Sequence, residues 1–181
     1  RDLDGAERHF LAARAAAVEA GNPYLAFTAV GNVADVRFED GRLDEAMASA
    51  REALDLAAPV LGVVPPHAGW TRWAIARVHY QRGALDEARA MADVAAGLCE
   101  AWGNPVFRVR TALLRARIAQ ACGQTEAARS VLDHAERVAR RGSDPALARQ
   151  VTRLRIALAV AQGDLPAARH WAAVLGQEPG A

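Results

Sequence analysis

Residues 41–46 read Gly-Arg-Leu-Asp-Glu-Ala, and variants of this stretch recur along the whole chain. The other copies begin at Gly83, Gly123 and Gly163, so the spacings are 42, 40 and 40 residues. A further copy that lacks the glycine begins at Arg1, 40 residues before Gly41. Self-similarity at a fixed period of this length is the sequence signature of helical-repeat proteins.

A second set of turn residues lies about halfway through each repeat. Gly-Asn-Pro occupies 21–23 and 103–105, a Gly-to-Pro segment runs from Gly62 to Pro66, and Gly-Ser-Asp-Pro occupies 142–145. Gly ends a helix by accepting a left-handed conformation, and Pro suits the first turn of the next helix. Each repeat is therefore predicted to be two helices. The nine predicted helices are 2–20, 23–40, 43–60, 67–82, 85–102, 105–122, 125–141, 145–162 and 165–175.

Small residues recur at helical spacing in the second helix of each repeat, as at Ala46, Ala50 and Ala53. They allow neighbouring helices to approach closely. One hairpin cannot bury its own apolar face, whereas a stack of hairpins can. We therefore expect one domain over residues 1–181, without an internal boundary. Because the repeat pattern is already under way at Arg1, we expect the chain to be a fragment of a larger protein.

The turn glycine, the acidic helix start and the alanines that follow resemble the second helix of a tetratricopeptide repeat (TPR). The repeat here is about 40 residues instead of the usual 34. That variant is similar to the sensor solenoid of the large ATP-dependent LuxR-type transcriptional regulators, the MalT-like group. Residues 157–171, A-L-A-V-A-Q-G-D-L-P-A-A-R-H-W, are especially similar to its last repeats. The resemblance implies an all-α, right-handed superhelical solenoid of antiparallel helix hairpins.

Composition and motifs argue against an enzyme. The chain lacks GxSxG, HExxH and a phosphate-binding GxxxxGK[ST] loop, and its five histidines lack metal-ligand spacing. We therefore expect no catalytic residue, metal or cofactor. Cys99 and Cys122 lie inside helical patterns, and no apolar run approaches the roughly 20 residues of a membrane span. These features favour a cytoplasmic protein.

A binding groove is predicted along the first helices of the hairpins, which line the concave face of TPR stacks. On helix 67–82 the groove positions form one helical stripe. Aromatic residues and Arg are enriched in binding hot spots. The alternative is that each Trp packs in the core between hairpins. The predicted binding residues are Trp70, Trp73, Arg77, Tyr80, Arg110, Arg117, Gln120 and Arg153.

The charge distribution suggests what such a groove would bind. Helices 67–82, 105–122 and 145–162 contain ten Arg and no Asp or Glu, although the whole chain has a net charge of +1. A basic inner wall favours a small anionic effector or an acidic peptide or protein. The alternative is that these Arg pair with acids on adjacent second helices. The candidate acids are Asp93, Glu100, Asp133 and Glu136.

Two functions follow from this pattern. The first is a ligand-sensing regulatory region of a MalT-like transcriptional regulator, which would work with ATPase and DNA-binding domains of the parent chain. The second is a TPR scaffold that holds a peptide or helix of another protein. Direct nucleic-acid binding is disfavoured because no reader motif is present. An open terminal hairpin makes a dimer a further expectation.

Overall fold

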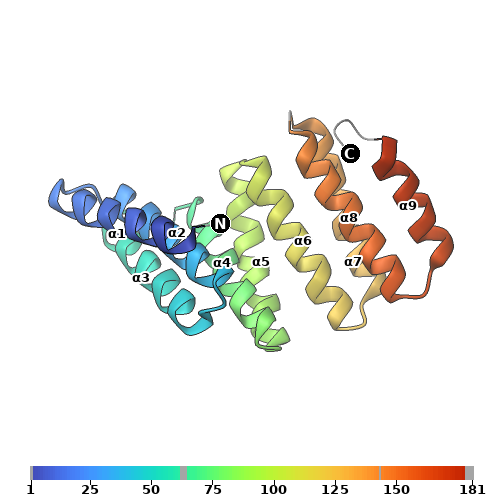
Figure 1. Ribbon diagram of the computed structural model, residues 1–181, viewed down its shortest axis with the longest axis horizontal. Helices are drawn as coiled ribbons and strands as arrows, with labels where there is room; N and C mark the ends of the chain where they lie inside the picture. The colour runs from blue at the N-terminus through green and yellow to red at the C-terminus, as the bar shows by residue number, and fades with distance from the viewer. Residues whose placement is uncertain (1, 62–64, 143, 178–181) are drawn as a thin grey trace. The chain divides into compact units, whose positions relative to one another are not determined.

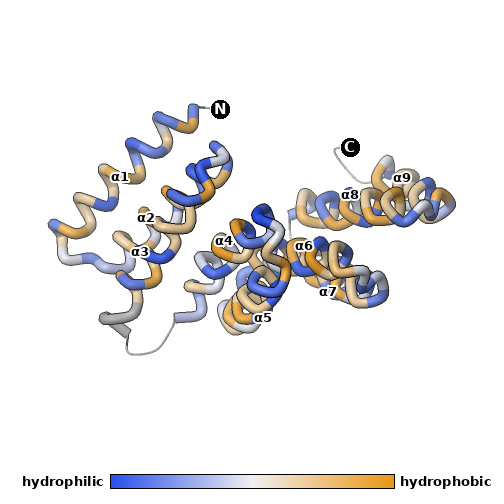
Figure 2. The backbone as a smooth tube through the Cα atoms, turned by 90° about the horizontal axis from the view of Figure 1, so that it is seen from below, coloured by the Kyte–Doolittle hydropathy of each residue, from blue (hydrophilic) through white to orange (hydrophobic). Residues whose placement is uncertain are grey.

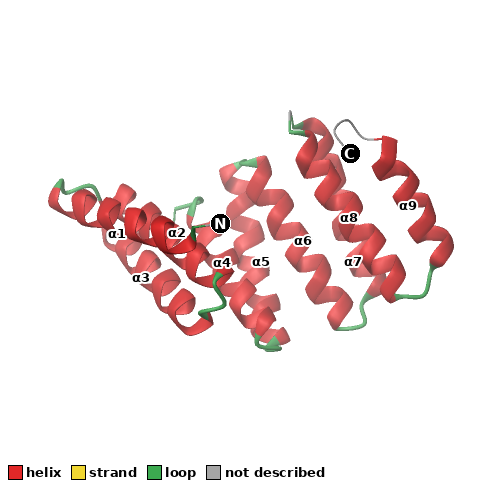
Figure 3. Cartoon of the chain, in the orientation of Figure 1, coloured by secondary structure: helices red, strands yellow, loops and turns green. Residues whose placement is uncertain are grey.

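The computed structural model of the 181-residue chain describes residues 2–61, 65–142 and 144–177. This part of the chain contains helices and turns and no strand. Every predicted helix is present, and no helix end differs from its prediction by more than two residues. The helices are α1 (Leu3–Glu19), α2 (Pro23–Glu39), α3 (Leu43–Leu61), α4 (Ala68–Gln81), α5 (Leu85–Trp102), α6 (Pro105–Ala121), α7 (Thr125–Arg141), α8 (Pro145–Ala161) and α9 (Leu165–Gln177) (Figure 3).

The helix ends follow from the local sequence. Pro23, Pro105 and Pro145 each open a helix, and the preceding Asn or Asp side chain accepts a hydrogen bond from a first-turn N–H. Positive φ angles of 63° to 79° occur at the glycines that end helices or begin the repeat motif, for example 79° at Gly41. These backbone angles favour Gly strongly over residues with a Cβ.

One predicted turn differs from the others. Gly142 has φ −83° and ψ 160°, so it is extended and not left-handed. The connection from Gly142 to Pro145 contains one residue more than the Gly-Asn-Pro turns. The predicted turn glycine Gly62 lies outside the described residues, as does the end of the chain after residue 177.

Contacts divide the chain into two compact units, Arg1–Trp102 and Gly103–Ala181, which we call unit 1 and unit 2. In unit 1, α2 packs mainly against α3 and α4 mainly against α5, and α1 covers α2 (Figure 1). In unit 2, the main pairs are α6 with α7 and α8 with α9, and α6 also contacts α8. The sequence predicts a single solenoid domain over both units, and this stays a prediction.

The core of each hairpin is built on the predicted stripe of small residues. Ala50, Ala53, Ala88 and Ala92 are 0% exposed. Leu132 occupies the equivalent position in α7 and belongs to the main cluster of unit 2. Figure 2 shows apolar and hydrophilic segments alternating along the helices, as expected when one face of each helix is buried.

Glycine allows two helices of unit 1 to come close together. A Cβ added at Gly69 on α4 would lie 2.9 Å from Cys99 Sγ and 3.0 Å from the backbone N of Cys99 on α5. A Cβ at Gly31 on α2 would lie 3.0 Å from the Trp70 ring. Real Cβ atoms rarely come this close to a neighbour, so the packing of α4 depends on the absence of a side chain at both places.

Among the described residues, no helix is both long enough and apolar enough to cross a membrane.

Candidate functional site

The two tryptophans of the predicted groove are buried. Trp70 and Trp73 lie on α4 and are 7% and 8% exposed. Trp70 Nε1 donates a hydrogen bond to Asp35 Oδ2 at 3.1 Å, and its ring packs edge-on against Phe27 at 6.4 Å between centroids. This burial agrees with the core-packing alternative, because little of either ring is left for a ligand. Their role in binding stays a prediction.

Arg77 on α4 is held by two acids of α2. Its guanidinium donates to Asp35 Oδ1 at 3.0 Å and to Glu39 Oε1 at 2.7 Å. The same group stacks over the rings of Phe38 and Trp73, at 3.7 Å and 4.4 Å from their centroids. Cation–π stacking and charge-assisted hydrogen bonds together fix this side chain, which is 15% exposed. Arg77 therefore joins α4 to α2.

The predicted binding residues of unit 2 are more open. Arg110 and Arg117 on α6 and Arg153 on α8 are all exposed. Within the part of the chain that the structure describes, neither Arg117 nor Arg153 forms a hydrogen bond or an ion pair. Gln120 is partly buried and accepts a hydrogen bond at 2.8 Å from Gln162 Nε2, just after α8. The predicted Tyr80, on α4 of unit 1, is also partly buried.

Some inner-helix arginines pair with acids. Arg155 on α8 is 9% exposed and donates to Asp133 Oδ1 at 2.6 Å and Glu136 Oε2 at 3.0 Å, both on α7. Its guanidinium also lies 4.4 Å from the centroid of the Trp171 ring on α9. Arg155 therefore joins three helices of unit 2. The pairing alternative is confirmed for this residue.

A cavity of about 300 Å³ lies beside Arg155 in unit 2. Its lining carries both signs of charge: Arg129 and Arg155, and Asp133 and Asp164. Arg129 Nη2 lies 4.0 Å from Asp164 Oδ2, and Arg155 pairs with Asp133. Because the charges of this cavity largely satisfy one another, it offers no net charge for a ligand.

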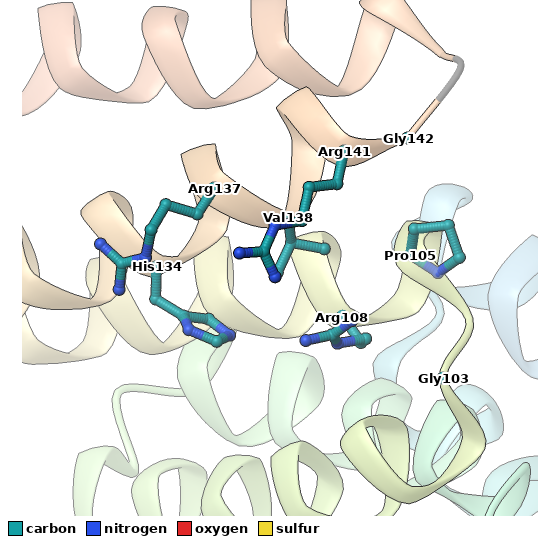
Figure 4. Close-up of a pocket in the computed structure, with 8 residues that line it drawn as sticks. All are labelled: Gly103, Pro105, Arg108, His134, Arg137, Val138, Arg141 and Gly142. Atoms are coloured by element: carbon teal, nitrogen blue, oxygen red, sulfur yellow. The ribbon is translucent and has the colours of Figure 1, made fainter.

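A second cavity, of about 250 Å³, has a different character and is drawn in Figure 4. It lies between the N-terminal part of α6 and the C-terminal part of α7, and it contains no carboxylate among its lining residues. We call it the basic pocket. It is lined by Arg108, His134, Arg137, Arg141, Val138, Pro105, Gly103 and Gly142.

Three titratable groups of unit 1 have shifted pKa values, and one of them is Arg42, whose pKa is raised by its hydrogen bond to Glu7. Hydrogen bonds from Arg42 and then Arg37 hold the pKa of Glu7 below its ordinary value of 4.5, against the opposing effect of burial. Burial lowers the pKa of His67, which lies among Tyr24 and Phe27 at ring-centroid distances of 4.9 Å and 5.0 Å. A charged imidazole is disfavoured where water is partly excluded. All three groups belong to unit 1, and none of them is among the residues that line the basic pocket.

No cluster of three or more His, Cys, Asp or Glu side chains that could hold a metal occurs in residues 2–61, 65–142 and 144–177. Cys99 is buried and Cys122 is partly buried, and neither is part of a disulfide bond among the described residues.

The stacked helical hairpins define a protein of the tetratricopeptide-like repeat class. The chain belongs to the family of MalT-like TPR regions, which matches residues 1–179. No curated protein sequence matches it.

Solved structures confirm the repeat fold. BtubC (BKLC) from P. vanneervenii has a TM-score of 0.75 at 19% identity, over 94% of this chain and 69% of that chain. A putative kinesin light chain from Podosopora anserina with nearly identical TPR-like repeats has a TM-score of 0.64 at 14% identity, over 96% of this chain and 92% of that chain. At these identities the similarity concerns the fold alone.

Sequence reasoning missed the basic pocket and the partners of Arg77. The signal for the partners was present, because α2 is the one inner helix that carries acids, at Asp35 and Glu39. The signal for the pocket lies in comparing repeats position by position, which shows cations in one hairpin where its neighbours have small or apolar residues.

Proposed function

We propose that this chain is the sensing region of a MalT-like transcriptional regulator, and that an acidic effector or protein segment binds to the inner helices of unit 2. We call the exposed arginines Arg110, Arg117 and Arg153 of α6 and α8 the inner arginine surface. Family membership supports the regulatory role. The proposed location of the binding site on α6 and α8 rests on the exposure of these three side chains.

Charge supports an acidic partner. Neither α6 nor α8 contains an Asp or a Glu, so no carboxylate on these two helices competes for the inner arginine surface. Arg presents planar donors that match a carboxylate or phosphate in a bidentate geometry. The Gln120–Gln162 hydrogen bond ties α6 to the C-terminal end of α8, which holds the two arginine-bearing helices together. A partner that contacts both helices would therefore meet a partly preorganised surface.

Regulation would follow from a population shift. A ligand that contacts both α6 and α8 binds more tightly to the conformation that presents their arginines at the right separation. It therefore raises the population of that conformation. Neighbouring domains of the regulator would respond to this change. A regulator that lacks residues 103–177 and keeps its full inducer response would contradict this proposal.

The location is tested by titrating a fluorescein-labelled hexaglutamate peptide and following its anisotropy. We expect saturable binding that Arg117→Ala and Arg153→Ala each weaken about fivefold, because each removes one charge-assisted contact. Arg169→Ala on α9 is the matched control: it removes the same charge from an exposed site of unit 2, and it should leave binding unchanged. Equal weakening by all three variants would show attraction to overall charge and would overturn the location.

A scaffold that holds a helix or peptide of another protein is the second candidate. It is supported by Val160, which is 56% exposed on α8, because an exposed apolar side chain on the same helix as Arg153 suits an amphipathic partner. Hexaglutamate binding that requires Arg117 and Arg153, together with an unchanged inducer response in a regulator carrying both substitutions, would favour the scaffold.

A further inference from the structure

We propose that the basic pocket of unit 2 binds the phosphate group of a small phosphorylated molecule. This site is separate from the inner arginine surface and does not depend on the proposed function. All eight residues that line it belong to unit 2, and four of them carry or can carry a positive charge.

The four basic side chains come from two helices that face each other. His134, Arg137 and Arg141 are three and four residues apart on α7, so they share one face of that helix. Arg108 is on the facing helix α6. Figure 4 shows the side chains of His134 and Arg141 extending from α7 toward Arg108. The arrangement concentrates positive charge from both sides of one cavity.

The state of each group suits a bound anion. Arg137 and Arg141 are exposed and have no hydrogen bond or ion pair among the residues that the structure places. Arg108 and His134 line the pocket and also take part in other interactions. Arg140, between the two exposed arginines in sequence, is engaged by Glu136 at 2.6 Å and does not line the cavity.

The neighbouring repeats show whether the hairpin fold requires basic residues at the positions that line the pocket. In the preceding repeat, the positions 40 residues before Arg108, His134, Arg137 and Arg141 hold Ala68, Val94, Gly97 and Ala101. In the following repeat, the positions after Arg108, His134 and Arg137 hold Ala148, Val174 and Gln177. The hairpin fold therefore does not require cations here. Arg137 and Arg141 in particular, which form no hydrogen bond or ion pair among the described residues, need a reason other than helix packing.

Size and chemistry indicate the ligand class. The cavity of about 250 Å³ is slightly smaller than the ~300–1,000 Å³ of pockets that enclose drug-sized ligands, so it suits a compact group. A phosphate dianion offers oxygens in several directions, which matches guanidinium groups converging from two helices better than a planar carboxylate does. Arg108 and Arg110 are two residues apart and leave α6 on different faces, so this pocket and the inner arginine surface can be tested separately.

The test is isothermal titration calorimetry of the 181-residue chain at neutral pH and constant ionic strength, with inorganic phosphate as the first probe. We expect saturable binding that Arg137→Ala and Arg141→Ala each weaken about tenfold. Arg140→Ala should bind phosphate as the unchanged chain does, since it removes the same charge from the same helix end outside the pocket. Circular dichroism checks that all three variants remain folded.

Three results would overturn the proposal. They are the absence of saturable phosphate binding, equal weakening by Arg140→Ala, and succinate binding as tightly as phosphate. Glycerol phosphate and a phosphoserine peptide then distinguish the source of the phosphate group. Glycerol phosphate should bind at least as tightly as the peptide, and tighter binding of the peptide would contradict the assignment to a small molecule. Hexaglutamate binding should be unchanged in Arg141→Ala. A failure of the phosphate proposal would therefore not count against binding at the inner arginine surface.

Discussion

The inner helices of the two units use arginine in opposite ways. In unit 1, Arg77 of α4 is bonded to Asp35 and Glu39 of α2 and lies against two aromatic rings. In unit 2, Arg117 occupies the equivalent repeat position 40 residues later and is exposed. The difference lies in the other inner helix of each unit. In unit 1 that helix is α2, which carries acids, and in unit 2 it is α8, which carries none. The same residue at the same repeat position therefore stabilises one unit and remains available for binding in the other.

The strongest test of this comparison is Arg77→Ala against Arg117→Ala. We expect Arg77→Ala to lower the free energy of unfolding by about 2 kcal/mol, because it removes two charge-assisted hydrogen bonds and leaves Asp35 with one donor fewer. Arg117→Ala should change it by less than about 0.5 kcal/mol, as an exposed substitution does. Urea unfolding followed by circular dichroism measures both. Equal losses of unfolding free energy in the two variants would show that the exposure of an arginine does not predict whether it stabilises the fold.

The acidic network of unit 1 should make its stability depend on pH. Glu7 bonds to Arg37 and Arg42, and its folded-state pKa is lowered from 4.5. The stability that this carboxylate contributes is therefore present above about pH 4.5 and is lost as pH falls through the lower folded-state pKa. Glu7→Gln should be less stable by on the order of 1 kcal/mol at neutral pH.

The difference between Glu7→Gln and the unchanged chain should shrink toward zero in acid, below the folded-state pKa of Glu7. Urea unfolding at a series of pH values measures it. Glu126→Gln in unit 2 is a suitable control, because its carboxylate is mostly exposed and pairs with Arg129 on the same helix. A difference for Glu7→Gln that stays constant with pH would contradict the charge-based explanation.

His67 should add a second, weaker pH effect in unit 1. Burial lowers its folded-state pKa below 6.5, so the unfolded chain binds a proton more readily. Stability is therefore expected to fall as pH drops below about 6.5, and to stop falling once the lower folded-state pKa is passed. Thermal unfolding between about pH 7.5 and about pH 5 should show this slope for the unchanged chain and a smaller slope for His67→Gln. An identical slope in both would assign the effect to other groups.

A small change in stability is expected from placing an acid on α8, which has none. Ala157 of α8 is exposed and occupies the repeat position of Arg77, and Arg117 of α6 occupies the matching position on the neighbouring inner helix. Ala157→Glu should pair with Arg117 and change the free energy of unfolding by less than about 1 kcal/mol. Hexaglutamate binding should nevertheless weaken several-fold. Ala157→Gln is the uncharged control and should bind normally.

The positions of the helices were predictable because their signals are local. Gly at a left-handed turn, Pro at a first helical position and small residues every three or four positions act within a single hairpin. The exception at Gly142 occurs where the connection to the next proline, Pro145, is one residue longer. These features depend on backbone geometry and helical periodicity, which the order of residues expresses directly.

The candidate sites were predictable only in part. The excess of arginine on the inner helices was visible in the sequence, but the state of each arginine depends on residues about 20 to 40 positions away, such as Asp35 for Arg77 and Asp133 for Arg155. The stripe of Trp70, Trp73 and Arg77 was predicted as a binding surface, and its burial is a consequence of packing between α4 and α2.

By itself, then, the sequence determined the repeat, the nine helices of the described residues and the MalT-like TPR class, because propensity, capping and periodicity operate over a few residues. Only the tertiary structure decided which arginines are paired, which aromatic rings are buried and where four basic residues line one cavity. Those outcomes depend on which side chains of separate helices meet, and that is set by how the hairpins pack within each unit.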